Sequence, residues 1–169
     1  MVGLVNSLYG KWTISAKDYT DAILRYDKEI GNLDFCAIQD YMCEPWILKK
    51  TGLSVKKHQE LTCRSYLELK SILPDINFIP ILQGWNLDDY LRHIELYNNL
   101  GINLFSGQIV GLGSVCRRES TNEIKQIVER LSSEKLRLHG FGVKTRGIAM
   151  YSKYLSSSDS LAWSYRARS

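Results

Sequence analysis

Apolar residues recur at three- or four-residue spacing in several long segments, and shorter apolar runs lie between these segments. In residues 15–30 the apolar side chains fall on one face of a helix, and Ser15 precedes them as an N-cap. The same spacing predicts helices over residues 54–72, 87–100, 120–134 and 145–157. At the start of the helix predicted over residues 120–134, Ser120 or Thr121 followed by an acid resembles a capping box.

The short apolar runs predict five strands, at residues 34–40, 78–84, 102–114, 137–143 and 159–164. A helix separates each strand from the next, and every connection is long enough for a crossover between parallel strands. No tandem repeat, low-complexity tract or linker rich in proline and glycine interrupts the chain. We therefore expect a parallel α/β arrangement in a single domain over residues 1–169.

Polar residues gather after the predicted strands. Asp40 follows the first strand, Gln83 the second, and His139 lies at the fourth. In parallel α/β folds, and in the TIM (β/α)8 barrel above all, the loops after the strands build the active site. A full barrel needs about 250 residues, so the chain of 169 residues is expected to hold part of one, about five βα units.

Composition and charge narrow the classes of partner. A formal net charge of +4 permits a nucleic-acid partner without requiring one. The four cysteines show no spacing typical of zinc sites, so we predict no metal and no cofactor within this chain. The N-terminal sequence does not resemble a signal peptide, and no apolar run approaches the ~20 residues of a membrane span. We therefore expect a cytoplasmic protein without a membrane role.

Five ordered motifs, QDYMCEPW, FIPILQGW, IVGLGSVCRR, LHGFGVKTRG and SSSDSLAWSYRAR, cover nearly the whole chain. Together they closely resemble the deazapurine DNA-modification transglycosylases of bacteria and phages, which are relatives of the tRNA-guanine transglycosylases. The resemblance implies a TIM barrel that replaces guanine in DNA with a 7-deazaguanine such as 7-cyano-7-deazaguanine (preQ0). It also implies a covalent aspartyl-sugar intermediate, and a location in a bacterial or phage-infected cell.

The resemblance also implies roles for individual residues. Asp159 matches the nucleophilic aspartate, and Asp40 matches the acid that accepts from guanine N1–H and its exocyclic amine. Gln83 would donate to the base O6. The implied base site contains Asp40, Gln83, Gly111, Leu112, His139 and Gly140. A structural role for His139 is an equally good interpretation.

Basic residues after three of the strands are the predicted phosphate contacts: Arg117, Arg118, Lys144, Arg146, Arg166 and Arg168. As a group they favour a rim that binds the DNA backbone, although each alone also fits a solvated surface charge. An open fragment of a barrel would expose strand edges and apolar surface. We therefore expect the chain to form homo-oligomers or to associate with other modification proteins.

Two expected motifs are absent from the sequence. The family's general acid/base aspartate lies in a DSGG-type motif, and a cysteine-rich segment that would hold zinc follows the last matched motif; neither occurs here. The chain is expected to be a fragment of a longer enzyme or a natural truncation. Two other functions stay open, a tRNA-guanine transglycosylase and a non-catalytic nucleic-acid-binding remnant.

Overall fold

The structure is a computed structural model that describes residues 12–118 and 120–160. Six α-helices lie in this part of the chain: α2 (Ala16–Ile30), α3 (Pro45–Thr51), α4 (Val55–Ile72), α5 (Leu87–Asn99), α6 (Asn122–Ser133) and α7 (Thr145–Tyr151). The strands are β1 (Cys36–Ala37), β2 (Phe78–Ile79), β3 (Ile81–Leu82), β4 (Ile109–Leu112), β5 (Arg137–Gly140) and β6 (Ser157–Ser158). A short 3₁₀ helix, Ser152–Tyr154, connects α7 to β6.

All strand pairs in the described residues are parallel. β1 pairs with β2, and β3, β4, β5 and β6 form a second sheet in that order. Pro80 separates β2 from β3 because proline has no N–H for the ladder. Its carbonyl still accepts a hydrogen bond from Gly111 N–H at 2.8 Å. The backbone thus continues past Pro80 against β4, and a mixed α/β fold with parallel sheets is confirmed.

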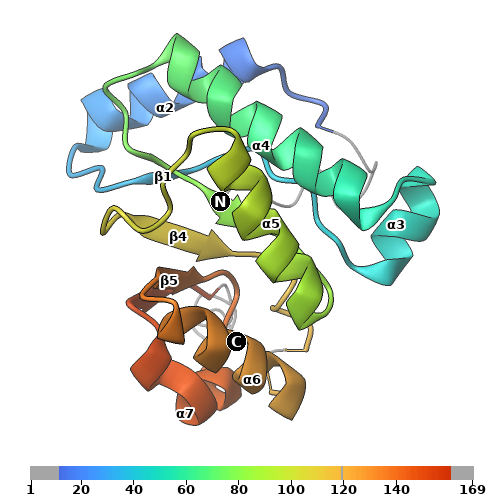
Figure 1. Ribbon diagram of the computed structural model, residues 1–169. Helices are drawn as coiled ribbons and strands as arrows, with labels where there is room; N and C mark the ends of the chain where they lie inside the picture. The colour runs from blue at the N-terminus through green and yellow to red at the C-terminus, as the bar shows by residue number, and fades with distance from the viewer. Residues whose placement is uncertain (1–11, 119, 161–169) are drawn as a thin grey trace, which may run out of the picture.

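Helices cover one face of the four-stranded sheet, β3 to β6 (Figure 1). The larger core cluster joins apolar side chains of α5, α6 and α7 to those of β3, β4 and β5. In α6, four fully buried side chains, Ile124, Ile127, Val128 and Leu131, recur at three- or four-residue spacing, as an amphipathic helix requires. A second cluster packs α2 and α4 against β1, β2 and β3.

Along each strand the side chains point alternately into the helix-covered core and toward the opposite face of the sheet. Val110 and Leu112 point into the helix-covered core, so Gly111 between them lies on the other face. Leu138 also enters that core, and its neighbour His139 faces the other side. Gly111 pairs in register with His139, which in turn pairs with Ser157. These residues form one row across the face that α5, α6 and α7 leave uncovered.

The five predicted helices are confirmed, with differences at their ends. Ser15 caps α2 as predicted, by accepting from Asp18 N–H, and Thr121 caps α6 by accepting from Ile124 N–H. The reciprocal capping box occurs instead at α5, between Asn86 and Asp89. Helix α3 was not predicted, and the predicted helix over 145–157 ends at Tyr151 because a 3₁₀ turn follows.

The last strand was predicted over residues 159–164, and its predicted start at Asp159 was wrong. The strand is Ser157–Ser158, which pairs with His139 and Gly140, so Asp159 follows the strand instead of beginning it. Residues 161–164 of the prediction lie outside the described part of the chain. The predicted strand over 102–114 contracts to Ile109–Leu112.

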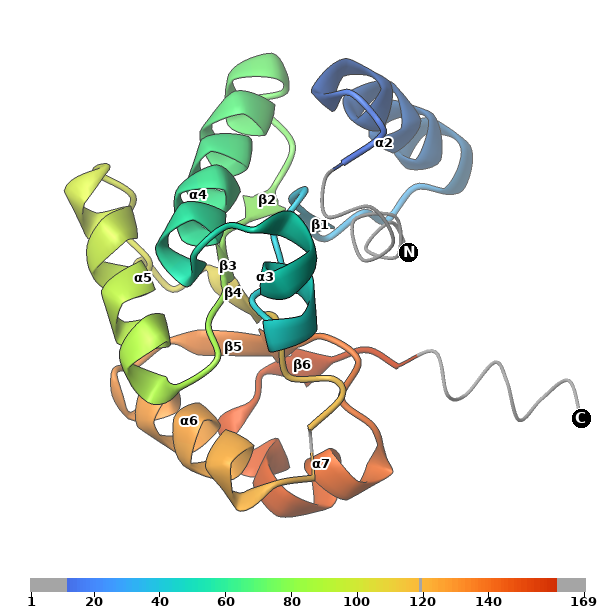
Figure 2. The ribbon, with the colours of Figure 1, turned by 90° about the vertical axis from the view of Figure 1, so that its right-hand side faces the viewer.

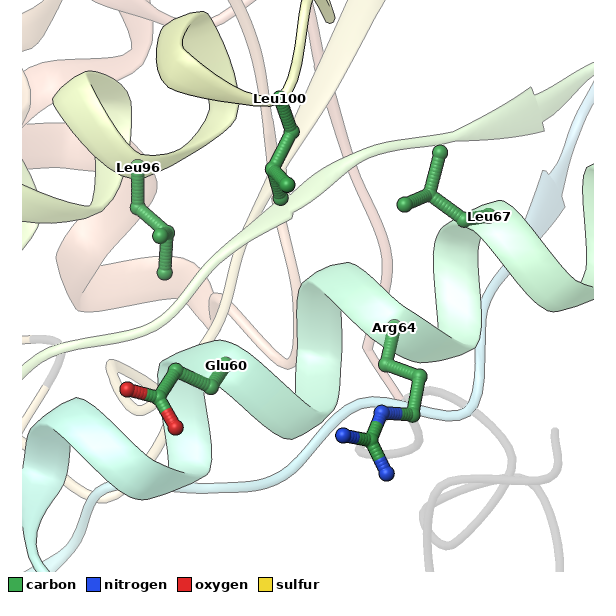
Figure 3. A pocket seen from close by; sticks show the side chains of 5 residues that line it. All are labelled: Glu60, Arg64, Leu67, Leu96 and Leu100. Carbon is green, nitrogen blue, oxygen red and sulfur yellow. The ribbon is translucent and has the colours of Figure 1, made fainter.

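A shallow groove of about 320 Å³ lies between α4 and α5. Glu60, Arg64 and Leu67 of α4 face Leu96 and Leu100 across it (Figure 3). None of the predicted site residues lines this groove. Among the described residues, no helix has the length and apolar content needed to cross a membrane.

Candidate functional site

The predicted site residues follow the carboxyl ends of the parallel strands. In Figure 1 the arrow of β4 points toward the side on which α3 lies, and Figure 2 turns that side toward the viewer. Asp40 comes three residues after β1, Gln83 directly after β3, and Asp159 directly after β6. Parallel pairing in the sheet of β3 to β6 puts Gln83 and Asp159 at one edge, and a hydrogen bond from Gln83 joins Asp40 of the other sheet to this edge.

A chain of side-chain hydrogen bonds connects three of the loops at this edge. The Gln83 amide donates from Nε2 to Asp40 Oδ2, and its Oε1 accepts from Ser114 Oγ at 2.6 Å. Ser114 Oγ also accepts from Cys43 N–H at 2.8 Å and lies 3.1 Å from Glu44 Oε2. The loops after β1, β3 and β4 are therefore held together by Gln83 and Ser114.

The backbone around Gln83 is fixed as firmly as its side chain. Gln83 N–H donates to His93 Nδ1 at 2.9 Å, and Gln83 C=O accepts from Gln59 Nε2 at 2.7 Å. A Cβ atom on Gly113 would lie 2.1 Å from Gln83 Nε2, so glycine at this position leaves the space that the amide occupies. Gln83 is fully buried. Its hydrogen bonds position Asp40, and its predicted contact with the base O6 stays a prediction.

Asp40 is a carboxyl group in a partly desolvated position. Burial raises its pKa from 3.8 to about 6, and the nearby Glu44 carboxylate adds to this rise. The hydrogen bond from Gln83 opposes the rise because it stabilises the charged form. At neutral pH Asp40 is therefore mainly an anion, with acceptor oxygens at the strand edge.

Asp159 is held at the end of β6 by the loop after β5. Its Oδ1 accepts from Gly142 N–H at 2.6 Å, and its own N–H donates to Gly140 C=O at 3.3 Å. Gly142 has a φ of +66°, a left-handed conformation that favours glycine. A Cβ there would lie 2.6 Å from Cys116 Cβ. The Asp159 carboxylate is exposed to solvent and has a fixed orientation relative to β5.

His139 lies between aromatic rings on the face of the sheet opposite the helices. Phe35 and Phe141 contact it edge to face, with ring centroids 5.3 and 4.8 Å away. Its Nδ1 lies 2.8 Å from Ser157 Oγ, and burial lowers its pKa although Asp159 opposes this change. The imidazole is therefore neutral at pH 7. Both the base-contact role and the structural role fit this placement.

Phe141 was not among the predicted site residues. Its ring covers Gly111, where an added Cβ would come within 2.5 Å of the ring. It is half-buried and lies on the same face as His139. Leu112 differs, because its side chain is fully buried in the core and its C=O accepts from Phe141 N–H at 3.3 Å. Any contact of Leu112 with a base would involve its backbone alone.

The predicted phosphate contacts separate into two groups. Arg117, Lys144 and Arg146 are exposed. Arg118 has a side chain that is only 9% exposed, and it forms an ion pair with Glu123 at 3.1 Å. Arg118 also donates to Trp85 C=O and lies 3.8 Å from the centroid of the Trp85 ring. In this structure Arg118 stabilises the loop after β4. Arg166 and Arg168 lie outside the described residues.

The sequence matches the DpdA family, described as DeoxyPurine in DNA protein A, over residues 3–169. The chain belongs to the DpdA family. A comparison with curated proteins found no match. Membership associates this DpdA-family chain with deazapurine modification of DNA, and DNA is the substrate that the family implies. The family is related to the tRNA-guanine transglycosylases, in agreement with the motifs quoted above.

Three residues that contact the candidate site residues were not predicted as site residues: Glu44, Ser114 and Phe141. Glu44 was visible as a second acid after β1, four residues from Asp40. Ser114 lies in a glycine-rich turn, and its φ of +56° is unusual for a residue other than glycine. The backbone conformation of Ser114 thus places the hydroxyl that joins three loops.

Proposed function

We propose that the chain carries the base pocket and the nucleophile of a base-exchange transglycosylase that replaces guanine in DNA with a 7-deazaguanine of the preQ0 type. The observation that supports this most strongly is the hydrogen-bonded chain of Asp40, Gln83 and Ser114 at the carboxyl edge of the sheet. Asp159 lies at the same edge, after β6.

Asp40 is the proposed reader of the base. A carboxylate accepts from guanine N1–H and from the exocyclic amine together, a pair of donors that adenine does not offer. Gln83 keeps Asp40 in one orientation, and Ser114 keeps Gln83 in place. A 7-deazaguanine offers the same two donors, so one pocket accepts both the departing and the entering base.

Phe141 is the proposed apolar surface for the base. Its ring is half-buried above Gly111, at the row of residues that faces away from the helices. A flipped base is commonly bound by stacking on aromatic side chains as well as by hydrogen bonds to its edge. This role of Phe141 adds to the contacts predicted for His139 and Gly140.

Asp159 is the proposed nucleophile. Its carboxylate forms a bond to C1′ of the sugar while the C1′–N9 bond breaks, and the electron pair leaves with guanine, which takes up a proton. The entering base then attacks C1′ through its ring nitrogen, releases the carboxylate and gives up its proton. The carboxylate also stabilises the positive charge that grows on the sugar as the base departs.

We propose for the architecture that the strands from β1 to β6 belong to five βα units of a TIM barrel. Parallel strands in consecutive order, with helices on one face, support this proposal. The row of Gly111, His139 and Ser157 would then face the barrel interior. Exposed Arg117, Lys144 and Arg146 would form the rim that contacts phosphates.

The proposed function is tested by incubating the full-length protein with guanine-containing DNA and preQ0, and then measuring modified nucleosides by mass spectrometry after digestion of the DNA. We expect deazaguanine in DNA, and none with an Asp159→Asn variant. An RNA of the same sequence in a parallel reaction distinguishes the tRNA-type activity. DNA that is bound but never modified would support the non-catalytic function instead.

A further inference from the structure

Helix α3 carries an exposed face that the base pocket does not use. Trp46 is 39% exposed, and Lys49 and Lys50 follow it at three- and four-residue spacing, so the three side chains share one side of the helix. Both lysines are exposed, and the sequence of α3, PWILKKT, holds no acid. This face is therefore aromatic and positively charged.

Arg117 extends this face from the loop after β4. Its guanidinium lies 4.6 Å from the centroid of the Trp46 ring, as in a cation–π contact. Arg118 and Trp85 form another such pair at this edge, but the Arg118 guanidinium already makes hydrogen bonds and an ion pair within the protein. Arg117 is exposed, and no ion pair within residues 12–118 and 120–160 neutralises it. Arg117 thus adds a positive charge to this face.

The face lies beside the base pocket. Glu44, the residue before α3, reaches Ser114 at 3.1 Å, and Cys43 N–H donates to the same hydroxyl. Figure 2 shows α3 in front of the ends of β3 and β4, on the side toward which the strands point. Helix α3 is therefore adjacent to the loops that hold Asp40 and Gln83.

We propose that Trp46, Lys49, Lys50 and Arg117 form a binding site for the unpaired nucleotide that adjoins the target guanine. The base of this nucleotide stacks against the pair formed by the Trp46 indole and the Arg117 guanidinium, and the two lysines contact its phosphates. The inference rests on the proposed action on DNA, because an extruded target leaves its neighbours partly unstacked. Stacking on one aromatic ring with cations along the backbone binds single strands without selecting a sequence.

The test is fluorescence anisotropy of the full-length protein with a labelled single-stranded oligothymidylate over a series of salt concentrations. We compare Trp46→Ala, Trp46→Phe and a Lys49→Ala/Lys50→Ala double variant with the wild type, and thermal unfolding verifies that each variant is folded. Lys28→Ala is the control, because Lys28 is an exposed lysine in the last turn of α2, on another part of the fold.

Trp46→Ala should weaken binding about 5- to 150-fold at every salt concentration, the range that loss of one stacked base implies. Trp46→Phe should restore most of the affinity. The double lysine variant should reduce the slope of log K against log salt by about 0.7 for each lysine, and Lys28→Ala should change neither quantity. Wild-type affinity in Trp46→Ala, or a wild-type protein that does not bind the oligothymidylate, would overturn the inference.

Base exchange in the same preparation separates this result from the proposed function. A protein that exchanges bases but binds DNA without Trp46 contradicts the inference alone. A protein that binds through Trp46 but never exchanges a base contradicts the proposed function alone.

Discussion

Replacement of Asp40 by asparagine should weaken base binding and stabilise the fold at the same time. The new side chain would present an amide donor to one of the two guanine donors, so a bidentate contact worth about 1–3 kcal/mol is lost. The affinity for preQ0 should therefore fall about 5- to 150-fold. Gln83 can still donate to the remaining amide oxygen, so the hydrogen bond between positions 40 and 83 persists.

The expected stabilisation follows from the pKa of Asp40. Burial raises this pKa from 3.8 to about 6 in the folded protein. The folded state therefore binds the proton more tightly than the unfolded state, and the wild type loses stability as the pH rises from about 4 through about 6. Two pKa units correspond to at most about 3 kcal/mol, and partial exposure of Asp40 reduces this value. An asparagine does not titrate and avoids the loss.

Urea unfolding and calorimetry with preQ0 measure both effects on one pair of proteins. The Asp40→Asn variant should equal the wild type in unfolding free energy near pH 4 and exceed it by about 1–2 kcal/mol near pH 7. An unfolding free energy that is lower than that of the wild type near pH 7 would refute the reasoning on burial. Unchanged affinity for preQ0 would remove Asp40 from the base site.

Three other predictions concern the support of the site. Gly113→Ala should displace the buried Gln83 amide, lower the unfolding free energy by about 1–3 kcal/mol and weaken preQ0 binding; wild-type values in thermal unfolding and calorimetry would contradict this. Arg118→Ala should lower the melting temperature far more than Arg117→Ala, because Arg118 pairs within the protein; equal melting temperatures would show that Arg118 is not structural. The chain of residues 1–169 should self-associate in size-exclusion chromatography through uncovered strand edges, and a rigid monomer protected from hydrogen exchange would oppose the partial-barrel proposal.

The helices were predictable because their burial depends mainly on local spacing. In α6 the buried positions repeat with the helical period, and a threonine cap marks the start. Helix α3 has only seven residues, and its apolar residues, Trp46, Ile47 and Leu48, are consecutive, which gives no periodic signal. Its exposed Trp46 and its lysines could therefore not be assigned to one surface from the sequence.

The start of the last predicted strand was wrong because β6 forms through its pairing with β5 and not through a typical strand composition. Ser157 and Ser158 are not typical strand residues, yet they complete the sheet beside His139 and Gly140. The apolar run after Asp159 has the stronger strand composition, and the prediction followed that composition. Tertiary context places Ser157 and Ser158 beside β5.

The sequence predicted which loops carry the candidate site residues, but it did not predict the hydrogen bonds between those loops. Parallel strands place their carboxyl ends together, so Asp40, Gln83 and Asp159 were expected at one edge from their positions after apolar runs. The hydrogen bonds of Ser114 depend on the relative heights of three loops, which no local pattern encodes. The internal pairing of Arg118 depends likewise on Trp85 and on Glu123 of α6.

The central claim is that Asp159 attacks the sugar, and trapping the covalent intermediate tests it most directly. The full-length protein is incubated with guanine-containing DNA and a base analogue that traps the intermediate, and the mixture is separated by denaturing electrophoresis. The wild type should give a protein–DNA adduct, and Asp159→Ala should give none while it still binds DNA. An adduct that persists in the Asp159→Ala protein would show that another residue is the nucleophile.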